Sequence, residues 1–222
     1  GKTSLVGALV KTMDSLAQKS ILLAPTGRAA KVFSLYAGHP AYTIHKKIYR
    51  QKSFSNEMTN FSLNDNLNTH TLFIVDESSM ISNDGLSGSS FGSGRLLDDL
   101  IQFVYSGTGC RLILMGDTAQ LPPVGEEESP ALSADILKGY GLEVQEIGLT
   151  QVVRQLENSG ILWNATKLRR YIAEENFLSL PKVRLKGFAD IRILPGNELI
   201  DELNTCYGRD GMDETMVICR SN

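Results

Sequence analysis

One short stretch constrains the fold most: four apolar residues, Leu72 to Val75, run directly into two acids, Asp76 and Glu77. An apolar run of this kind is typical of a strand buried on both faces, as in a parallel sheet covered by helices. Open α/β sheets bind their ligands beyond the carboxyl ends of the strands. The two carboxylates are therefore expected at a binding edge, although an apolar strand can also end in two acids by chance.

The chain opens with Gly1-Lys2-Thr3-Ser4, the second half of a phosphate-binding loop of the form GxxxxGK[ST]. We expect a helix to begin there, with the backbone N–H groups of these four residues and the Lys2 ammonium holding the phosphates of ATP. The Thr3 hydroxyl is then a ligand for Mg²⁺. A second strand must offer an acid to the magnesium, and Asp76 is positioned to do so, while Glu77 is positioned to deprotonate the attacking water.

Two further apolar runs end in polar or small residues. Ser20–Ala24 is followed by Pro25-Thr26-Gly27, and Arg111–Met115 is followed by a loop that contains Gln120. Gln120 is a candidate to contact the γ-phosphate or the attacking water, as glutamines do in other phosphate-loop enzymes. We predict that all three apolar runs are parallel strands of one sheet. Their carboxyl ends should surround one pocket with Lys2, Asp76 and Gln120.

The formal net charge of −3 gives no support for nucleic-acid binding, but the distribution of charge does. The stretch from Ser15 to Phe54 has no acidic residue, and aromatic residues are interleaved with its basic residues, which include Arg28 and Lys46. Single-stranded DNA is bound through such a combination of positive charge and flat rings. The stretch is either a DNA-binding face or a solvated basic surface over core aromatics. His45 fits a packing role and a DNA contact equally well.

We place a domain boundary near Gln151, with a first domain at residues 1–150 and the beginning of a second at 151–222. Within the first, residues 49–70 are polar and rich in Asn, and are interpreted as a small inserted β-hairpin or a mobile loop. Arg154 is a candidate to stabilise transition-state charge, or an ordinary surface residue. We also predict short strands at three later places, Glu143–Ile147, Ile191–Leu194 and Met216–Cys219.

Two classes of protein are disfavoured. No apolar run approaches the ~18 residues that a membrane span requires, so no membrane partner is expected. The three cysteines are widely spaced, odd in number and without metal-ligand spacing, which favours a reducing compartment. We therefore expect a cytoplasmic location, associated with the nucleoid if the organism is bacterial.

Six motifs in order resemble those of superfamily-1 DNA helicases of the RecD-like type, which include the exodeoxyribonuclease V alpha chain. The resemblance covers nearly the whole chain, and its strongest parts are GDTAQLPPVG and APTGRAAK. The motifs are APTGRAAK (Ala24–Lys31), TIHK (Thr43–Lys46), VDESSMIS (Val75–Ser82), GDTAQLPPVG (Gly116–Gly125), LTQVVRQ (Leu149–Gln155) and VICRSN (Val217–Asn222).

The resemblance implies an α/β fold: a RecA-like P-loop NTPase domain with a parallel central sheet, followed by an incomplete second RecA-like domain. It implies a motor that hydrolyses ATP with Mg²⁺ to move 5′ to 3′ on single-stranded DNA in recombination and repair, with other subunits of a helicase–nuclease complex as possible partners. It makes residues 49–70 a small pin domain. The residues carried over are Lys2 and Thr3 for phosphate and magnesium, Asp76 for magnesium, Glu77 as base, Gln120 as γ-phosphate sensor, Arg154 as the arginine that follows the first motor domain, and Pro25, Thr26, Gly27 and His45 along the DNA path.

Two other functions stay open: a nucleotide-dependent DNA-binding switch without motor activity, and a non-motor subunit of a multi-subunit nuclease. DNA-stimulated ATP turnover would favour the motor, and nucleotide binding without stimulation would favour the switch. The upstream half of the phosphate loop and the late helicase motifs are not in the sequence. We therefore expect a fragment of a longer helicase, with little or no activity by itself.

Overall fold

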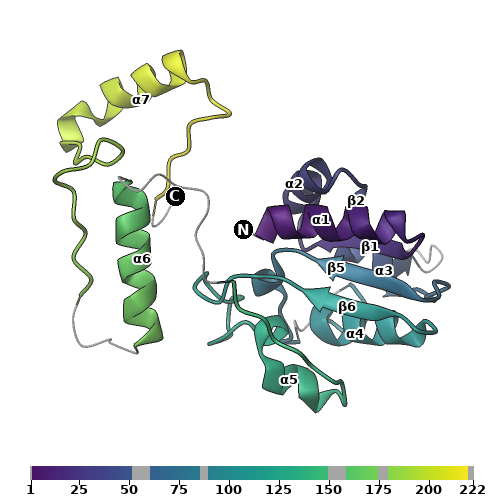
Figure 1. Cartoon of the computed structure of the whole chain (residues 1–222). Coiled ribbons are helices and arrows are strands. Elements are labelled where there is room, and N and C mark those ends of the chain that lie inside the picture. The colour runs from purple at the N-terminus through teal and green to yellow at the C-terminus, as the bar shows by residue number, and fades with distance from the viewer. Residues whose placement is uncertain (1, 52–60, 86–89, 150–158, 175–179, 220–222) are drawn as a thin grey trace. The chain divides into compact units, whose positions relative to one another are not determined.

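The computed structural model describes residues 2–51, 61–85, 90–149, 159–174 and 180–219. The chain divides into two compact units, Gly1–Val153 and Arg154–Asn222, and each is described by itself (Figure 1). The division lies three residues beyond the end of the first predicted domain at residue 150. None of the described helices is long and apolar enough to span a membrane.

The first unit is built on a four-stranded sheet in the order β2-β1-β5-β6. The three predicted strands, β1 (Lys19–Ala24), β5 (Thr71–Val75) and β6 (Arg111–Leu114), are adjacent and parallel, which confirms the predicted central sheet. A fourth strand, β2 (Ala41–Thr43), pairs in parallel with the outer side of β1 and was not predicted.

Helices cover both faces of this sheet (Figure 1). Alternate side chains of a strand point to opposite faces, and both faces are apolar because both are covered. On one face, α1 (Lys2–Ser15) and α2 (Gly27–Ala37) pack Val6, Val10 and Phe33 against Leu22 and Ile74. On the other face, the buried cluster contains Leu23, Phe73 and Val75 together with side chains from α3 (Ile44–Ile48), α4 (Leu96–Ser106) and α5 (Ala134–Gly139).

A separate two-stranded sheet lies within residues 49–70. Strands β3 (Tyr49–Gln51) and β4 (Phe61–Leu63) pair antiparallel, and the residues between them, 52–60, lie outside the described part of the chain. The ring of Phe61 stacks on that of Phe91 with 4.5 Å between centroids. Tyr49 donates a hydrogen bond of 2.6 Å to the buried carboxylate of Asp99 on α4, so the base of this sheet is joined to the core.

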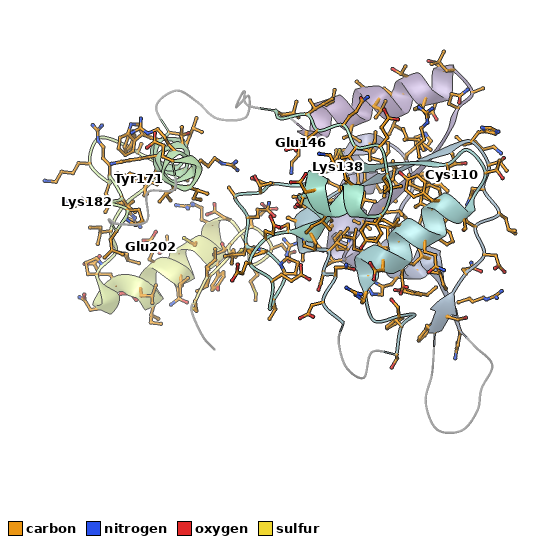
Figure 2. All side chains as sticks on the ribbon, turned by 90° about the horizontal axis from the view of Figure 1, so that it is seen from below. Cys110, Lys138, Glu146, Tyr171, Lys182 and Glu202 are labelled. Atoms are coloured by element: carbon orange, nitrogen blue, oxygen red, sulfur yellow. The ribbon has the colours of Figure 1, made fainter. Side chains whose placement is uncertain are left out.

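Irregular segments follow β5 and β6. The 3₁₀ turn η1 (Ser78–Met80) comes two residues after β5, and η2 (Pro130–Leu132) precedes α5. The strand predicted at Glu143–Ile147 is wrong, because these residues pair with no described strand and are irregular. Cys110, the buried residue before β6 (Figure 2), is a free thiol, as are Cys206 and Cys219.

The second unit contains α6 (Gly160–Ala173), the 3₁₀ turn η3 (Gly196–Glu198) and α7 (Leu199–Arg209). The strands predicted at Ile191–Leu194 and Met216–Cys219 are wrong, and the described residues of this unit form no strand. A strand exists only where a neighbouring strand completes its hydrogen-bond ladder, and neither segment pairs with any described residue of the chain. Their side chains are instead exposed, Ile193 at 74% and Ile218 at 86%.

Candidate functional site

The register of the sheet decides which loops meet. Leu23 pairs with Val75, and Val75 pairs with Leu114, so β1, β5 and β6 end side by side. Pro25-Thr26-Gly27, Asp76-Glu77 and the loop that carries Gln120 therefore leave the sheet at one edge. This edge is where open α/β sheets bind ligands.

The start of α1 reaches the same edge. The short turn Leu16–Gln18 joins the end of α1 to the beginning of β1. Helix α1 has 14 residues and is therefore ~21 Å long, about the length of β1. It lies along the strands (Figure 1). Lys2 therefore returns to the carboxyl edge, where the first N–H groups of a helix favour anions.

Asp76 is held firmly at the end of β5. Asp76 is only 9% exposed to solvent. Its Oδ1 accepts a hydrogen bond of 2.9 Å from the backbone N–H of Glu77, and its Oδ2 accepts one from the hydroxyl of Tyr36 on α2. The Asp76 N–H donates to the carbonyl oxygen of Leu23 at 3.0 Å. The carboxylate is therefore held by the Glu77 backbone and by α2, and the Asp76 backbone is held by β1.

Glu77 differs from Asp76 in backbone and exposure. Its φ of 53° and ψ of 38° are left-handed, a conformation that costs an L-residue about 1–2 kcal/mol. The side chain is half-exposed. The left-handed residue ends the strand and turns the chain into η1, where the N–H of Ser78 donates to the carbonyl oxygen of Met115 at 2.8 Å. Two successive carboxylates thus belong to residues of different exposure, one buried and one partly exposed.

Gln120 lies in the loop after β6 and is exposed. Its backbone N–H donates to the carbonyl oxygen of Asp117 at 3.0 Å. Its Oε1 accepts a hydrogen bond of 3.1 Å from the hydroxyl of Ser79 in η1. Sequence reasoning missed Ser79, although the residue lies within the VDESSMIS motif, because no local pattern shows which of two adjacent serines meets a residue 41 positions away.

The remaining predicted nucleotide and DNA residues are placed less directly. Thr26 caps α2, its hydroxyl oxygen accepting from the N–H of Ala29 at 3.2 Å, and Arg28 beside it is exposed. The backbone of Thr3 and Ser4 lies in the first turn of α1. Gly1 and Arg154 lie outside the described residues.

His45 and Lys46 have different environments on α3. The His45 ring is half-buried, with ring centroids 5.6 Å from Tyr49 and 5.1 Å from Phe91, and burial lowers its pKa below the ordinary 6.5. The imidazole is therefore largely neutral at pH 7, which favours a packing role. Lys46 is exposed, and its Nζ lies 5.7 Å from the centroid of the half-exposed Tyr42 ring.

The residues at this edge fit a magnesium nucleotide by their chemistry. Mg²⁺ keeps several waters and uses one or two protein carboxylates, and Asp76 offers one rigid, nearly buried carboxylate. The phosphates would be met by the start of α1 and by Lys2. Among the described side chains, the Asp76 carboxylate is therefore the group that would hold the metal.

Comparisons with known proteins identify the family of the chain. A family model described as an AAA domain matches residues 1–178. The ATP-dependent RecD2 DNA helicase of Deinococcus radiodurans is 31% identical over 163 residues, which are 73% of this chain and 19% of the relative. This match confirms the predicted resemblance to RecD-like helicases, and the chain spans about a fifth of that relative's length.

Two solved structures are similar at lower identity. A Bacteroides Pif1 bound to single-stranded DNA is 22% identical with a TM-score of 0.47, covering 92% of this chain and 50% of the other. A structure of two Pif1 helicases at forked double-stranded DNA is 22% identical with a TM-score of 0.36, covering 63% of this chain and 31% of the other.

Proposed function

Because the chain belongs to the AAA domain family, we propose that it is the nucleotide-hydrolysing part of an ATP-dependent DNA helicase or translocase. One observation carries the proposal: the register of β1, β5 and β6 brings Asp76, Glu77 and Gln120 to one edge, together with the start of α1. The relative that matches most of the chain, RecD2 of Deinococcus radiodurans, has ATP-dependent helicase activity in its name.

Each group at this edge has a role in the proposed reaction. Lys2 and the first N–H groups of α1 bind the β- and γ-phosphates. Thr3 and Asp76 hold Mg²⁺, which neutralises charge on the phosphate oxygens when it is bound. Glu77, which follows Asp76 at the same edge and is partly exposed, orients the attacking water and accepts its proton. Gln120 meets the γ-phosphate or the water.

Two further parts of the proposal concern the whole protein. Residues 1–150 would be the first RecA-like motor domain with a pin at 49–70, and 151–222 would begin the second, which supplies Arg154 to the transition state. The whole protein would act in the cytoplasm in DNA recombination and repair, alone or with other subunits of a helicase–nuclease complex.

The acid-free stretch supplies the proposed DNA face. Pro25-Thr26-Gly27 leaves the sheet beside the nucleotide edge, and Arg28 and Lys46 are exposed. Lys46 over the half-exposed Tyr42 ring pairs a cation with a flat face that a base can stack on. His45 is assigned a packing role beneath them, because its ring is enclosed by Tyr49 and Phe91.

The DNA face is tested by neutralising Lys46, Lys47 and Arg50 together in the full-length protein. Each phosphate contact contributes to the salt dependence of binding, so single-strand affinity should fall and the slope of log K against log salt should decrease by about 1–3. Replacing Lys11 and Lys138, both exposed and outside the stretch, is the matched control. Unchanged affinity and slope in the triple variant would return the stretch to an ordinary solvated surface.

The catalytic assignment is tested by comparing Glu77→Gln with Asp76→Asn in the full-length protein. Glu77→Gln keeps the shape of the side chain but removes the base, so ATP turnover on saturating single-stranded DNA should fall ~10²–10⁴-fold with ATP·Mg²⁺ binding retained. Asp76→Asn should also weaken the magnesium-dependent part of ATP binding. Turnover assays and ATP titrations with and without Mg²⁺ measure both effects. Parent-rate hydrolysis by Glu77→Gln would show that Glu77 is not the base.

The competing function is a nucleotide-dependent DNA-binding switch, which would use the same edge to bind ATP and change DNA affinity without a motor. ATP turnover separates the two functions. A full-length protein whose hydrolysis rises strongly with single-stranded DNA is a motor, and one that binds ATP without stimulated turnover is a switch.

A further inference from the structure

The loop that carries Glu77 and the loop that carries Gln120 are hydrogen-bonded to each other. We name residues 76–84 the acid loop and residues 116–130 the glutamine loop. The hydroxyl of Ser79 in the acid loop donates to Oε1 of Gln120 at 3.1 Å. In return, the hydroxyl of Ser129 in the glutamine loop donates to the carbonyl oxygen of Ser79 at 3.1 Å. One residue of the acid loop is therefore joined to both ends of the glutamine loop.

A second connection lies farther along both loops. One carboxylate oxygen of Glu126 accepts three hydrogen bonds from the acid loop: from the hydroxyl of Ser82 at 2.6 Å, from the N–H of Asn83 at 2.7 Å and from the N–H of Asp84 at 2.9 Å. Hydrogen bonds to a charged acceptor are among the stronger ones in proteins. Glu126 thus fixes the distance between the two loops, and Ser79 lies between this anchor and the nucleotide edge.

Burial makes Ser79 sensitive to what Gln120 does. Ser79 has no solvent-exposed surface, whereas Gln120 is exposed. If the Gln120 side chain turned away, a buried hydroxyl would lose its acceptor, and an unsatisfied buried donor is costly. The orientation of an exposed side chain at the nucleotide edge is therefore linked to the position of a buried residue in the acid loop.

The connection from Ser79 back to Glu77 is short and stiff. Glu77 precedes η1 and its carbonyl oxygen accepts from the N–H of Met80 at 3.1 Å, so the two residues belong to one hydrogen-bonded turn. Ser78 between them has no exposed surface and is bonded to Met115 and to Val75. The backbone N–H of Ser78, which a change of its side chain would leave in place, keeps this turn attached to the end of β6, so we expect a displacement of Ser79 to be passed to Glu77 within the turn.

We propose that Ser79 is the positioning residue that couples Gln120 to Glu77. With Oε1 accepting from Ser79, the end of Gln120 that would meet a phosphate oxygen is its amide nitrogen, a donor. When Gln120 moves toward the nucleotide, Ser79 follows or loses its acceptor, and the turn that presents Glu77 shifts with it. The inference rests on the proposed function, because it assigns Ser79 to the coupling between γ-phosphate sensing and the base.

The test uses two neighbouring serines in the full-length protein. Ser79→Ala removes the bond to Gln120. Ser78→Ala is the matched control, because Ser78 is equally buried but its hydroxyl donates to the carbonyl oxygen of Val75 at 3.1 Å. ATP turnover is measured without DNA and with saturating single-stranded DNA, with KM for ATP and the thermal midpoint. We expect Ser79→Ala to reduce the ratio of stimulated to basal turnover at least roughly 5-fold with KM unchanged, and Ser78→Ala to keep the parent ratio.

Ser79→Cys, which keeps the size of the side chain and replaces the hydroxyl by a weak donor, covers the case in which Ser79→Ala does not fold, and it should also reduce the stimulation ratio. A double-mutant cycle of the Ser79 variant with Gln120→Ala tests the bond between the two side chains. If both variants fold, their effects should not add. Equal ratios in Ser79→Ala and Ser78→Ala, or additive effects in the cycle, would overturn the coupling while leaving the motor intact. A parent protein without DNA-stimulated turnover would overturn the proposed function and the coupling together.

Discussion

The two units of the chain contain similar apolar runs but use them differently. In the first unit, Leu72–Val75 lies between two parallel neighbours and is buried within the sheet. In the second, Met216–Cys219 is equally apolar and Ile191–Leu194 is apolar apart from Arg192, but neither segment forms a strand. An apolar run indicates that a segment can be buried. Whether it becomes a strand depends on a partner for its backbone N–H and C=O groups.

The units are also held together by different interactions. All large buried apolar side chains of the described residues belong to the first unit. In the second unit the buried polar residue is Asn164, whose amide nitrogen donates to the carbonyl oxygens of Gly160 and Arg184 at 2.7 and 2.8 Å and whose Oδ1 accepts from the Arg184 N–H at 2.8 Å. Apolar burial stabilises one unit, and side chain–backbone hydrogen bonds organise the other.

The largest effect that would test this contrast comes from the core of the first unit. Phe73 is fully buried, with its ring edge-on to Phe103 at 6.0 Å, so Phe73→Ala should lower the free energy of unfolding of the first unit by about 3–5 kcal/mol. Ile193→Ala in the second unit, at a side chain that is 74% exposed, should cost less than about 0.5 kcal/mol. Urea denaturation measures both. A comparable loss in Ile193→Ala would mean that the second unit has an apolar core of its own.

An intermediate effect is expected from Asn164→Ala. Truncation removes the three hydrogen bonds of the Asn164 side chain, two of which join α6 to Arg184, which should cost the second unit about 1–3 kcal/mol. Trp163 on α6 is the single tryptophan of the chain, so its fluorescence reports unfolding of the second unit alone. Thr166→Ala, at an exposed position of the same helix, is the control. Equal midpoints for the two variants would contradict the role given to the Asn164 hydrogen bonds.

The smallest effect is a pH dependence confined to the second unit. Asp190 accepts from the hydroxyl of Ser159 and from the N–H groups of Gly160 and Ile161 at the start of α6. These hydrogen bonds lower the pKa of Asp190 from 3.8 to about 2, and the bond from Ser159 has the largest effect. Because the pKa is lower in the folded state, ionised Asp190 stabilises the second unit at any pH above the pKa of the unfolded state. This contribution is lost as the pH falls from about 4 to about 2.

Trp163 fluorescence should therefore change across this acidic window in the parent protein. Asp190→Asn, which does not titrate, should flatten this part of the profile. The stability of the first unit, followed by hydrogen exchange of the backbone amides in β1 and β5, should not depend on the Asp190 substitution. An Asp190→Asn profile identical to that of the parent would exclude this carboxylate as the source.

The predictable part of the fold follows from local patterns. Three apolar runs correctly predicted the strands β1, β5 and β6. The acids after Val75 lie at a strand end because a run buried on both faces must end where polar residues begin. The unpredicted strand β2 has three residues and forms by pairing with β1. The contact between Ser79 and Gln120 depends on the register of β5 and β6. Such features are set by tertiary pairing, which periodicity does not contain.

At position 77 the residue that function requires and the residue that stability favours are different, because the backbone there is left-handed. Glycine enters this region without the steric cost that glutamate meets. Libraries screened only for heat resistance should therefore accumulate glycine at position 77, and each such gain would remove the carboxylate on which the proposed hydrolysis depends. Stabilising this protein without disabling it means holding residue 77 constant while the rest of the chain varies.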